Sequence, residues 1–516
     1  MIIAISLLLL MFFANISLTM LYYIHMYQLN SYQNLSHINW IKSKFLKDII
    51  FRNCWLVIPV VISFSDNLVL FITGTIISYV LTFTVNRKKV LKKPLVYTGR
   101  VTRLIITLGL LNFIVCILSI RFLNVWQIAL LLAVWTIMLP FLVMVAGFIN
   151  APIEKSINNK FIKEAKNIIK DMPRLTVIGI TGSYGKTSTK YFLNKILSIK
   201  YNVLMTPGNY NTTLGVVRTI REKLNATHEI FLCEMGARHV NDIKEICDLV
   251  NPKYGIISSI GPQHLETFFS IENVIKTKFE LADAIPEDGA VFLNYSNEYI
   301  RNNKVDKNIV TYGFSDEEYV AYDIRVNAKG SVFTVKSKNG ECETFRTKLI
   351  GRHNVENILG AIAIGNKLGI PFSDMVYAIR SLDPVPHRLE LVKGNNAMLI
   401  DDAYNSNPVG AKAALDTLSC FEGTKILITP GMIELGERQY DCNKEFGKQA
   451  TGVCDYIVLV GKDQTKPIRD GIEECGFDEK KLFVADSFNE GIKWISELKC
   501  DKEKFVLIEN DLPDNY

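Results

Sequence analysis

The stretch VIGITGSYGKTSTK, residues Val177 to Lys190, decides how the rest of the chain is interpreted. A short apolar, β-branched run, Leu175–Ile180, leads into its glycines, and Lys186–Lys200 has the apolar spacing of an amphipathic helix. The glycines therefore lie at a strand-to-helix turn, where backbone amides can wrap a phosphate at a helix N-terminus. The sequence predicts a phosphate-binding loop (P-loop) on a parallel α/β sheet.

Each part of this loop has an expected task. Gly182 and Gly185 let the backbone approach the phosphates, and Lys186 offers a positive charge to the outer ones. The Thr187 hydroxyl can coordinate Mg²⁺. The strict pattern GxxxxGK[ST] fails, because Ile180 occupies the position of its first glycine. Strand, turn and helix together still favour a nucleoside triphosphate site over an incidental turn, with these expected ligands: Thr181, Gly182, Ser183, Gly185, Lys186, Thr187 and Ser188.

The first 150 residues have a different character. A membrane span needs about 20 apolar residues. The region contains five apolar runs, of which the second is short and the third and fourth are marginal: 3–25, 54–65, 68–85, 104–120 and 125–148. They predict a multi-pass transmembrane region of about five helices over 1–150, followed by a linker helix over 151–170. No Lys or Arg and no small-residue cleavage site accompanies the first run, which argues against a cleaved signal peptide.

Charge predicts the orientation of these runs. Basic residues crowd two connections, around 42–52 and 87–103, and both are expected to be cytoplasmic. The residues after 149 then also lie in the cytoplasm. No Asp, Glu, Lys or Arg occupies the middle of a run, whereas transport paths usually carry such groups. The favoured interpretation is an anchor or docking platform, and the alternative is a groove for a lipid substrate.

The charge balance also excludes some functions. The net charge of +6 arises in residues 1–150, which hold twelve Lys and Arg and only Asp48 and Asp66. The remaining 366 residues carry 46 basic and 50 acidic groups. A basic membrane region suits anionic lipid headgroups, and the slightly acidic remainder excludes nucleic-acid binding. Ten cysteines without a CxxC pair indicate neither disulfides nor a zinc site.

Seven stretches in the same order resemble the Mur ligases, the ATP-dependent amide-forming enzymes of bacterial cell-wall (peptidoglycan) peptide synthesis. They are GITGSYGKTS (179–188), TPGNYNTTLGV (206–216), EMGARHVNDI (234–243), IGPQHLETF (260–268), KTKFEL (276–281), GRHNVEN (351–357) and DDAYNSNP (401–408). The similarity spans about 171–465 and is strongest to the branch that adds D-alanyl-D-alanine to a nucleotide-linked tripeptide. The apolar region stands where the family has its N-terminal nucleotide-sugar-binding domain.

The resemblance implies a site for ATP and two Mg²⁺ ions. Glu234 follows the apolar run Ile230–Cys233, so it should project beside the phosphate-binding loop and bind metal with Thr187. His264 follows another strand and resembles the ligand of the second ion. Lys278, on a helix over 273–284, matches the family lysine that reacts with CO₂ to form a carbamate, which is also a metal ligand. The ordinary alternatives are a solvated rim position for Glu234, a structural role for His264 and a surface position for Lys278.

The resemblance also implies roles for residues outside the loop. Asn354 and Asn357 would contact the nucleotide, although Asn354 could instead cap a helix. Arg388 would reach the γ-phosphate when the domains close. Asp402 resembles the family's ribose or acceptor-side carboxylate, and Asp401 is assigned no role. The expected catalytic groups are Lys186, Lys278, His264 and Arg388, and the expected substrate-side residues are Asn209, Asn211, Thr212, Tyr404 and Asn405.

The predicted architecture is an α-helical transmembrane region followed by two α/β domains. A P-loop parallel-sheet ATPase domain should cover 171–383, with a small β-rich insert near 320–350. Strands at 424–429, 455–460 and 504–508 alternate with helical stretches, which predicts a Rossmann-like C-terminal domain over 384–516. The chain ends FVLIENDLPDNY where the D-alanyl-D-alanine ligases have a KGS-type element. That departure leaves the acceptor amine open.

Three classes of function remain. The first is a membrane-anchored Mg·ATP-dependent ligase that forms an acyl phosphate, acting on a small-molecule or lipid-linked envelope precursor, with other envelope-synthesis proteins as partners. Its carboxylate could be the tripeptide or a lipid-linked or polymeric uronic acid or glutamate. The second is a transporter driven by the phosphate-binding loop, which would not need the GRHNVEN and DDAYNSNP elements. The third is an inactive scaffold, against which Lys186, Glu234, His264 and Lys278 argue.

Overall fold

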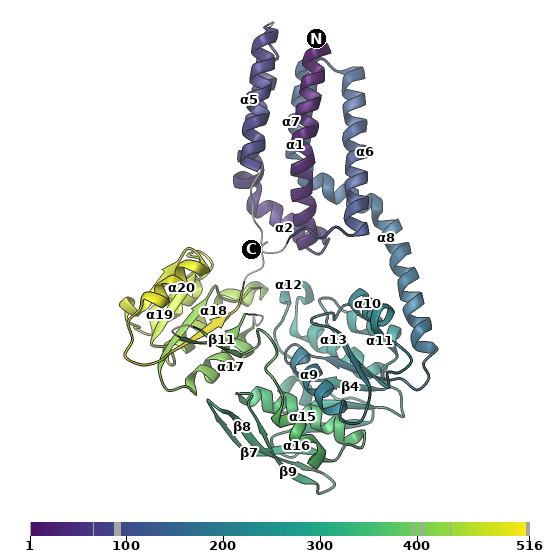
Figure 1. Ribbon diagram of the computed structural model, residues 1–516, viewed down its shortest axis with the longest axis vertical. Helices are drawn as coiled ribbons and strands as arrows, with labels where there is room; N and C mark the ends of the chain where they lie inside the picture. Colours follow the sequence, from purple (N-terminus) through teal and green to yellow (C-terminus); the bar gives the residue numbers. More distant parts are fainter. Residues whose placement is uncertain are drawn as a thin grey trace. The chain divides into compact units, whose positions relative to one another are not determined.

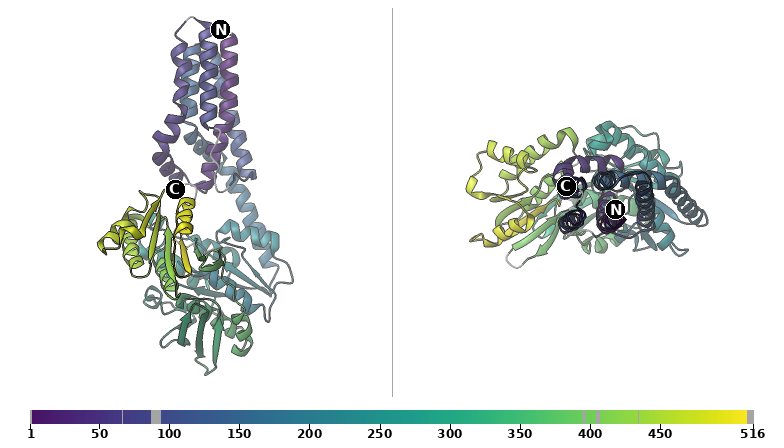
Figure 2. Two further views of the ribbon diagram at one scale, coloured as in Figure 1. Left: turned by 60° about the vertical axis from the view of Figure 1, so that its left-hand side comes forward. Right: turned by 90° about the horizontal axis from the view of Figure 1, so that it is seen from above.

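The computed structural model describes residues 2–65, 67–86, 94–394, 397–403, 407–433 and 435–511. It contains two compact units, one within the first 159 residues and one formed by residues 160–511. The first is helical, and the second holds two β-sheets with helices packed on them. Figures 1 and 2 show the elements of each unit.

Four helices of the first unit lie side by side as a bundle (Figures 1 and 2): α1 (Ile2–Leu29), α5 (Leu68–Asn86), α6 (Gly99–Phe122) and α7 (Val125–Ile137). Shorter helical segments join α1 to α5: α2 (Asn34–Lys44), η1 (Phe45–Ile50), α3 (Phe51–Asn53), η2 (Cys54–Leu56) and α4 (Val57–Ile62). The faces between the helices bury apolar side chains such as Leu8, Phe12, Leu108 and Leu132. The outward faces of α5 and α6 expose large apolar side chains instead.

Within the described residues, α1, α5 and α6 are long and apolar enough to cross a membrane. The bent pair α7 and α8 (Leu139–Lys170) adds a fourth candidate if it forms one span. The run 54–65 contributes only to the short apolar helix Phe51–Ile62. Five crossings, as predicted from the five runs, therefore exceed the three or four that length and composition support.

The run 125–148 is not the single helix that was predicted. Helix α7 ends at Ile137, α8 begins at Leu139, and the two axes differ by 72°. Pro140 is the physical reason, because it has no N–H to donate to Thr136 and its ring clashes with the preceding turn. The predicted linker helix over 151–170 is also not separate, since α8 continues through Pro152 to Lys170.

The first sheet of the second unit has nine strands in the order β2-β3-β1-β4-β5-β6-β7-β8-β9. Its bounds are β1 (Thr176–Thr181), β2 (Val203–Met205), β3 (Ile230–Glu234), β4 (Tyr254–Ile257), β5 (Ala290–Asn294), β6 (Ile309–Gly313), β7 (Tyr319–Asn327), β8 (Gly330–Ser337) and β9 (Cys342–Thr347). The first six strands in this order, β2-β3-β1-β4-β5-β6, are parallel to their neighbours. Strands β7 to β9 form the antiparallel, β-rich insert expected near 320–350.

Helices cover both faces of the parallel part, as its apolar strands require. On one face, Ile178 and Ile180 pack with α9 (Lys186–Leu197), α15 (Arg352–Lys367) and α16 (Phe372–Arg380). On the other, Val177 packs with α10 (Thr213–Lys223), α11 (Asp242–Val250), α13 (Ile271–Ala284) and the last turns of α8. Two short helices, α12 (Leu265–Phe268) and α14 (Glu298–Arg301), follow β4 and β5.

The second sheet has the order β10-β11-β15-β12-β13-β14, and every pair except β10·β11 is parallel. Its strands are β10 (Glu390–Lys393), β11 (Ala397–Asp402), β12 (Thr424–Thr429), β13 (Tyr456–Val460), β14 (Leu482–Ala485) and β15 (Lys504–Glu509). Its helices are α17 (Pro408–Ser419), η3 (Gly436–Arg438), α18 (Gln439–Thr451), α19 (Lys466–Glu474), η4 (Glu479–Lys481) and α20 (Phe488–Glu497). The prediction of an α/β domain with β12, β13 and β15 is confirmed, and β10, β14 and α19 were missed.

Strand order determines where a site can form. In the first sheet β1 lies between β3 and β4, so the carboxyl ends of these three strands are neighbours. Ligands of open parallel sheets bind outside such carboxyl ends. The loop after β1, Glu234 at the end of β3 and the segment after β4 therefore share one edge of the sheet.

Candidate active site

The loop between β1 and α9 has the backbone geometry of a phosphate-binding turn. Gly182 and Gly185 have φ angles of +150° and +78°, which residues with a Cβ rarely adopt. A Cβ on Gly185 would lie 2.4 Å from Oδ1 of Asn357. The Lys186 ammonium folds back onto the loop and donates to the carbonyls of Gly182 (2.7 Å) and Ser183 (3.1 Å). The glycines are therefore required by both the turn and its close packing.

The segment after β4 holds the other side of the loop. The Ser183 amide donates to the Ser259 carbonyl (2.6 Å), and the Ser183 hydroxyl donates to the Gly261 carbonyl (3.0 Å). The Tyr184 hydroxyl reaches the Pro262 carbonyl at 2.7 Å. This support was not predicted, although the small and turn-forming residues SSIGP directly after a strand were the available signal. His264, two residues beyond Pro262, follows with a left-handed φ of +51°.

Glu234 is the centre of a buried polar cluster beside the loop. Its Oε1 accepts from the Thr187 hydroxyl and from the Asn211 side-chain amide, both at 3.1 Å. Its Oε2 accepts from the Lys190 ammonium at 2.8 Å. Burial alone would raise the pKa of this carboxyl, but Lys190, the nearby Lys186 charge and the Asn211 hydrogen bond together lower it. Glu234 is therefore an anion with oxygen directed at Thr187, as a Mg²⁺ ligand must be.

Lys278 comes to the same edge from α13. Its side chain is 1% exposed, and it makes no hydrogen bond or ion pair with any residue that the structure describes. Burial, reinforced by the charge of Lys186, lowers the pKa of Lys278 well below its usual value, against the opposing effect of Asp242 and Glu280. The predicted surface alternative is wrong for Lys278, because a solvated lysine would not be enclosed.

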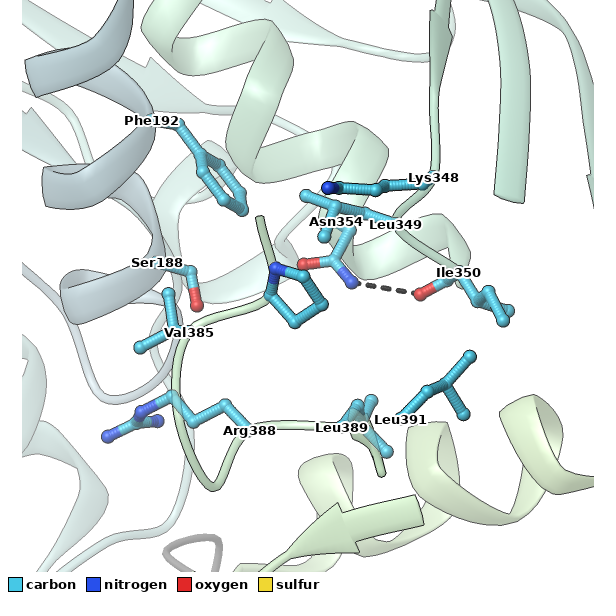
Figure 3. Close-up of a pocket in the computed structure, with 11 residues that line it drawn as sticks. Ser188, Phe192, Lys348, Leu349, Ile350, Asn354, Val385, Arg388, Leu389 and Leu391 are labelled. Carbon is cyan, nitrogen blue, oxygen red and sulfur yellow. Dashed lines mark hydrogen bonds between the residues drawn. The ribbon is translucent and has the colours of Figure 1, made fainter. Parts of the chain in front are cut away.

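A pocket lies beside the loop, between α9, the start of α15 and the segment that leads into β10 (Figure 3). Its lining consists of Ser188, Phe192, Lys348, Leu349, Ile350, Asn354, Pro384, Val385, Arg388, Leu389 and Leu391. The Asn354 amide donates to the Ile350 carbonyl at 2.8 Å, as Figure 3 shows. Apolar side chains line the pocket together with polar groups, among them Lys348, Asn354 and Arg388.

Arg388 and Asn357 connect this pocket with the loop. The charge of Arg388 contributes, after burial, to lowering the pKa of Lys186 to about 8, so the two cations lie near each other. Asn357 is not part of the lining; its Oδ1 accepts from the Thr189 hydroxyl at 3.3 Å and packs against Gly185. Asn354 is therefore the one of the two asparagines that faces the pocket. The residue that caps the N-terminus of α15 is Gly351, not Asn354.

Two acids at the end of β11 hold the chain on either side of Arg388. Asp401 contacts the His387 ring at 2.7 Å, and Asp402 accepts from the Leu389 amide at 3.2 Å. His387 and Leu389 both have left-handed φ angles, +59° and +51°. Because such backbone is strained for residues with a Cβ, these contacts are what present Arg388 toward the loop.

The remaining predicted residues have varied surroundings. The Thr181 hydroxyl is buried and donates to the Met235 carbonyl at 2.9 Å, which ties the ends of β1 and β3 together. Thr212 caps α10, and Asn209 is exposed in the loop before it. Tyr404 and Asn405 lie outside the described residues.

The departure from the KGS-type element falls at the end of β15. Glu509 is fully buried and lies opposite Asp402 in the sheet register. Burial, reinforced by the charge of Asp402, raises the pKa of Glu509 well above its usual range. The buried carboxyl of Glu509 thus stands next to Asp402 where β11 and β15 end.

Comparison with known proteins adds the following. Residues 180–365 match the family model of the Mur ligase middle domain, and residues 387–509 match that of the Mur ligase glutamate ligase domain. The chain is 34% identical over 275 residues to the UDP-N-acetylmuramoyl-tripeptide–D-alanyl-D-alanine ligase of Bacillus subtilis, which covers 52% of this chain and 59% of that protein. To the enzyme of the same name from Haemophilus influenzae it is 30% identical, over 66% of this chain and 71% of that protein.

Among solved structures, MurF from Acinetobacter baumannii superposes with a TM-score of 0.63 at 25% identity, covering 69% of this chain and 77% of that one. The matched segment of this chain thus spans between 59% and 71% of the length of the two relatives compared above. The two family models match in the expected order, and the Haemophilus influenzae relative is covered over more than two thirds of its length. Both findings agree with a phosphate-binding loop next to Glu234. The chain belongs to the Mur ligase family.

Proposed function

We propose that this protein is an ATP-dependent amide ligase that joins a carboxylate of a cell-envelope precursor to an amine. The observation that carries the proposal is the meeting of four groups at one sheet edge: Lys186, Thr187, Glu234 and Lys278. The hydrogen bond from Thr187 to Glu234 (3.1 Å) and the influence of Lys186 on Lys278 support it. Cationic and metal-binding groups around one phosphate loop suit a reaction that gathers negative charge.

The reaction consists of two balanced steps. A carboxylate oxygen of the substrate attacks the γ-phosphorus of ATP, which breaks the bond to the β-phosphate oxygen and releases ADP. The amine nitrogen then attacks the resulting acyl phosphate, forms the amide, loses a proton and expels phosphate. Lys186 and Arg388 would neutralise charge on the transferred phosphoryl group, and the chain's main contribution is positioning.

The donor set fits Mg²⁺, because a hydroxyl and a carboxylate are hard oxygen ligands that already point at each other. Thr187 and Glu234 would hold one ion, and His264 and Lys278 are proposed for a second. Bound Mg²⁺ would offset the charge of the phosphates. The pocket lined by Asn354 would receive the base of the nucleotide. Asp402 would contact the ribose or the acceptor side of the site.

Lys278 is proposed to react with CO₂ and become a carbamate. That reaction needs a neutral amine, because only an unprotonated nitrogen can attack carbon, and it releases one proton. The lowered pKa of this buried lysine favours the neutral form. The product is an anionic oxygen ligand next to Lys186.

The helical unit is proposed to anchor the ligase in the cell membrane as a multi-pass region, with both sheets in the cytoplasm. Three long apolar helices and the basic connections support this orientation. The substrates of the relatives, a UDP-N-acetylmuramoyl-tripeptide and D-alanyl-D-alanine, are the first candidates. Glu509, where those ligases have the KGS-type element, favours testing other acceptor amines, and the apolar region in place of the N-terminal domain favours testing other envelope carboxylates, including lipid-linked ones.

Phosphate release by the detergent-solubilised full chain tests the proposal. ATP is combined with the tripeptide nucleotide or another carboxylate, and with an amine, and the amide is identified by mass spectrometry. Release that depends on both partners and yields an amide is the expected result. Release that no carboxylate–amine pair stimulates would contradict a ligase and favour transport. Lys186→Ala should lose phosphate release in every mixture.

A further inference from the structure

Lys190 is a fully buried cation that the reaction proposed above does not use. It lies on α9, one helical turn after Lys186, and its side chain is 0% exposed. Its ammonium contacts Glu234 Oε2 at 2.8 Å and donates to the Gly208 carbonyl at 2.6 Å. A buried charge is retained only when partners compensate its lost hydration. Lys190 is therefore committed to Glu234 and Gly208, and not to the nucleotide phosphates.

The loop Thr206–Thr212 is tied to Glu234 at several points besides Gly208. The Glu234 amide donates to the Thr206 hydroxyl at 3.1 Å, and the Asn211 side chain donates to Oε1 at 3.1 Å. The amide after Met235, that of Gly236, donates to the Asn211 carbonyl at 2.7 Å. Metal ligand and loop thus form one hydrogen-bonded network, in which Lys190 supplies the charge.

The two oxygens of Glu234 have different tasks in this network. Oε1 faces Thr187, the other expected metal ligand, whereas Oε2 is occupied by Lys190. An ion at Oε1 would fix the carboxylate, and the ammonium on Oε2 would transmit that restraint to the Gly208 carbonyl. The loop so restrained carries Asn209, Asn211 and Thr212, the residues expected to meet the carboxylate substrate.

We propose that Lys190 is a positioning residue that couples the binding of Mg·nucleotide at Glu234 to ordering of the loop Thr206–Thr212. The coupling rests on the proposed function, because it assumes that Glu234 binds the metal. It goes beyond that function by making the substrate loop respond to the nucleotide before any carboxylate is present.

Hydrogen exchange of the full chain in detergent tests the coupling. Exchange is measured for peptides covering 206–212, without ligand, with a non-hydrolysable ATP analogue in EDTA, and with the analogue and Mg²⁺. In the unaltered protein Mg²⁺ with the analogue should slow loop exchange by about tenfold, within the range usual for coupled sites. In Lys190→Met the slowing should fall to less than about twofold. A fluorescent ATP analogue measures nucleotide binding in parallel.

The ratio with and without Mg²⁺ separates coupling from a merely structural role. A structural role would speed loop exchange equally in both states and leave the ratio unchanged, which would overturn the proposal. Lys195→Met is the matched control, because Lys195 is exposed on the same helix. Its ratio should equal that of the unaltered protein.

If the unaltered protein binds the nucleotide with Mg²⁺ but shows no slowing of the loop, the coupling is refuted and the proposed function stands. If it binds no nucleotide, both fail. If thermal unfolding shows that Lys190→Met is poorly folded, Lys190→Gln is read by the same criterion, since its shorter, uncharged amide keeps a donor next to Glu234.

Discussion

The chemistry of this site is concentrated in lysines that are removed from water. Lys186 and Lys278 both have lowered pKa values, chiefly because burial disfavours their charged forms. Lys190 is equally buried but is paired with Glu234. Of these three lysines, only Lys190 is paired with a carboxylate of the described residues, and this difference separates the proposed positioning group from the lysines proposed to meet a phosphate or CO₂.

The pH dependence of nucleotide affinity follows from Lys186. Its pKa of about 8 in the free protein should rise when a triphosphate binds, because the anion favours the ammonium form. Binding therefore takes up a proton above pH 8, and the affinity should fall by up to about tenfold per pH unit above that value. Below pH 8 the lysine is already charged and this dependence disappears.

The measurement is a titration with a fluorescent ATP analogue between pH 7 and 9.5. Lys186→Arg is the control, because a guanidinium stays charged throughout this range and its variant should show a flat profile. An unaltered protein whose affinity does not change up to pH 9.5 would contradict the assignment of Lys186 to the phosphates.

Lys278→Ala tests the carbamate. Removing a charged group that stabilises the transition state typically lowers turnover by about 100-fold or more. Short carboxylic acids such as acetate should restore part of the activity, because their oxygens can occupy the space of the carbamate. Lys276→Ala, two residues away and exposed, should retain full activity. Equal turnover in both variants would remove the carbamate from the mechanism.

At the scale of elements, the site depends on short connections whose backbones are strained. The turn from β1 to α9 needs two glycines, and the segment before β10 needs left-handed His387 and Leu389 around Arg388. Hydrogen bonds from neighbouring segments hold each connection in place. The segment after β4 holds the phosphate-binding loop, and the end of β11 holds the residues on either side of Arg388. Strain of this kind persists only where surrounding contacts impose it.

Gly185→Ala should disrupt the loop by two effects. A Cβ at φ +78° is strained, and it would lie 2.4 Å from Asn357 Oδ1. We expect a loss of about 1–3 kcal/mol of unfolding free energy and a clear weakening of nucleotide binding. Gly340→Ala is the control, since Gly340 has φ +88° in the hairpin between β8 and β9 with open space around it.

Thermal unfolding and nucleotide titration check this prediction. Gly340→Ala should show some loss of stability from strain and no change in nucleotide affinity. A Gly185→Ala protein that binds nucleotide as well as the control would mean that the loop tolerates a side chain, and that the phosphates bind elsewhere.

At the scale of the whole molecule, the two units have surfaces suited to different surroundings. The helical unit exposes large apolar side chains such as Leu110 and Phe113 on α6, which water would disfavour. The unit with the sheets buries an apolar core on each face of its first sheet, and it carries slightly more acidic than basic groups. The proposed membrane anchoring rests on the first property, and the proposed cytoplasmic position of the ATP site rests on the basic connections.

Membrane fractionation tests this anchoring. The chain should remain in the membrane pellet after washing with high salt and with carbonate at high pH, and should be released by detergent. Salt would release a protein held by basic residues alone, because surface charges are screened. Release by carbonate would contradict transmembrane helices. A peripheral protein of the same membranes serves as the control for complete washing.

Some of this protein was determined by local sequence. The turn between β1 and α9 depends on glycines, a lysine and a threonine within ten residues, so its chemistry was readable before any fold. Strands β12, β13 and β15 are short apolar runs bounded by polar ones, and their short length and β-branched residues favour strands over helices. Pro140 was visible too, and it marks the break that the apolar run 125–148 concealed.

Tertiary structure decided the rest, because the partners are distant in sequence. Lys190 and Glu234 are 44 residues apart, and Asn357 meets Thr189 across 168 residues. Whether a lysine on α9 is solvated or buried depends on which strand end it meets, and that is fixed by the order β3-β1-β4. The reactive groups could be identified from the sequence because residue type and local backbone conformation are local properties. The partner of each charged side chain depends on tertiary packing, so only the structure could identify it.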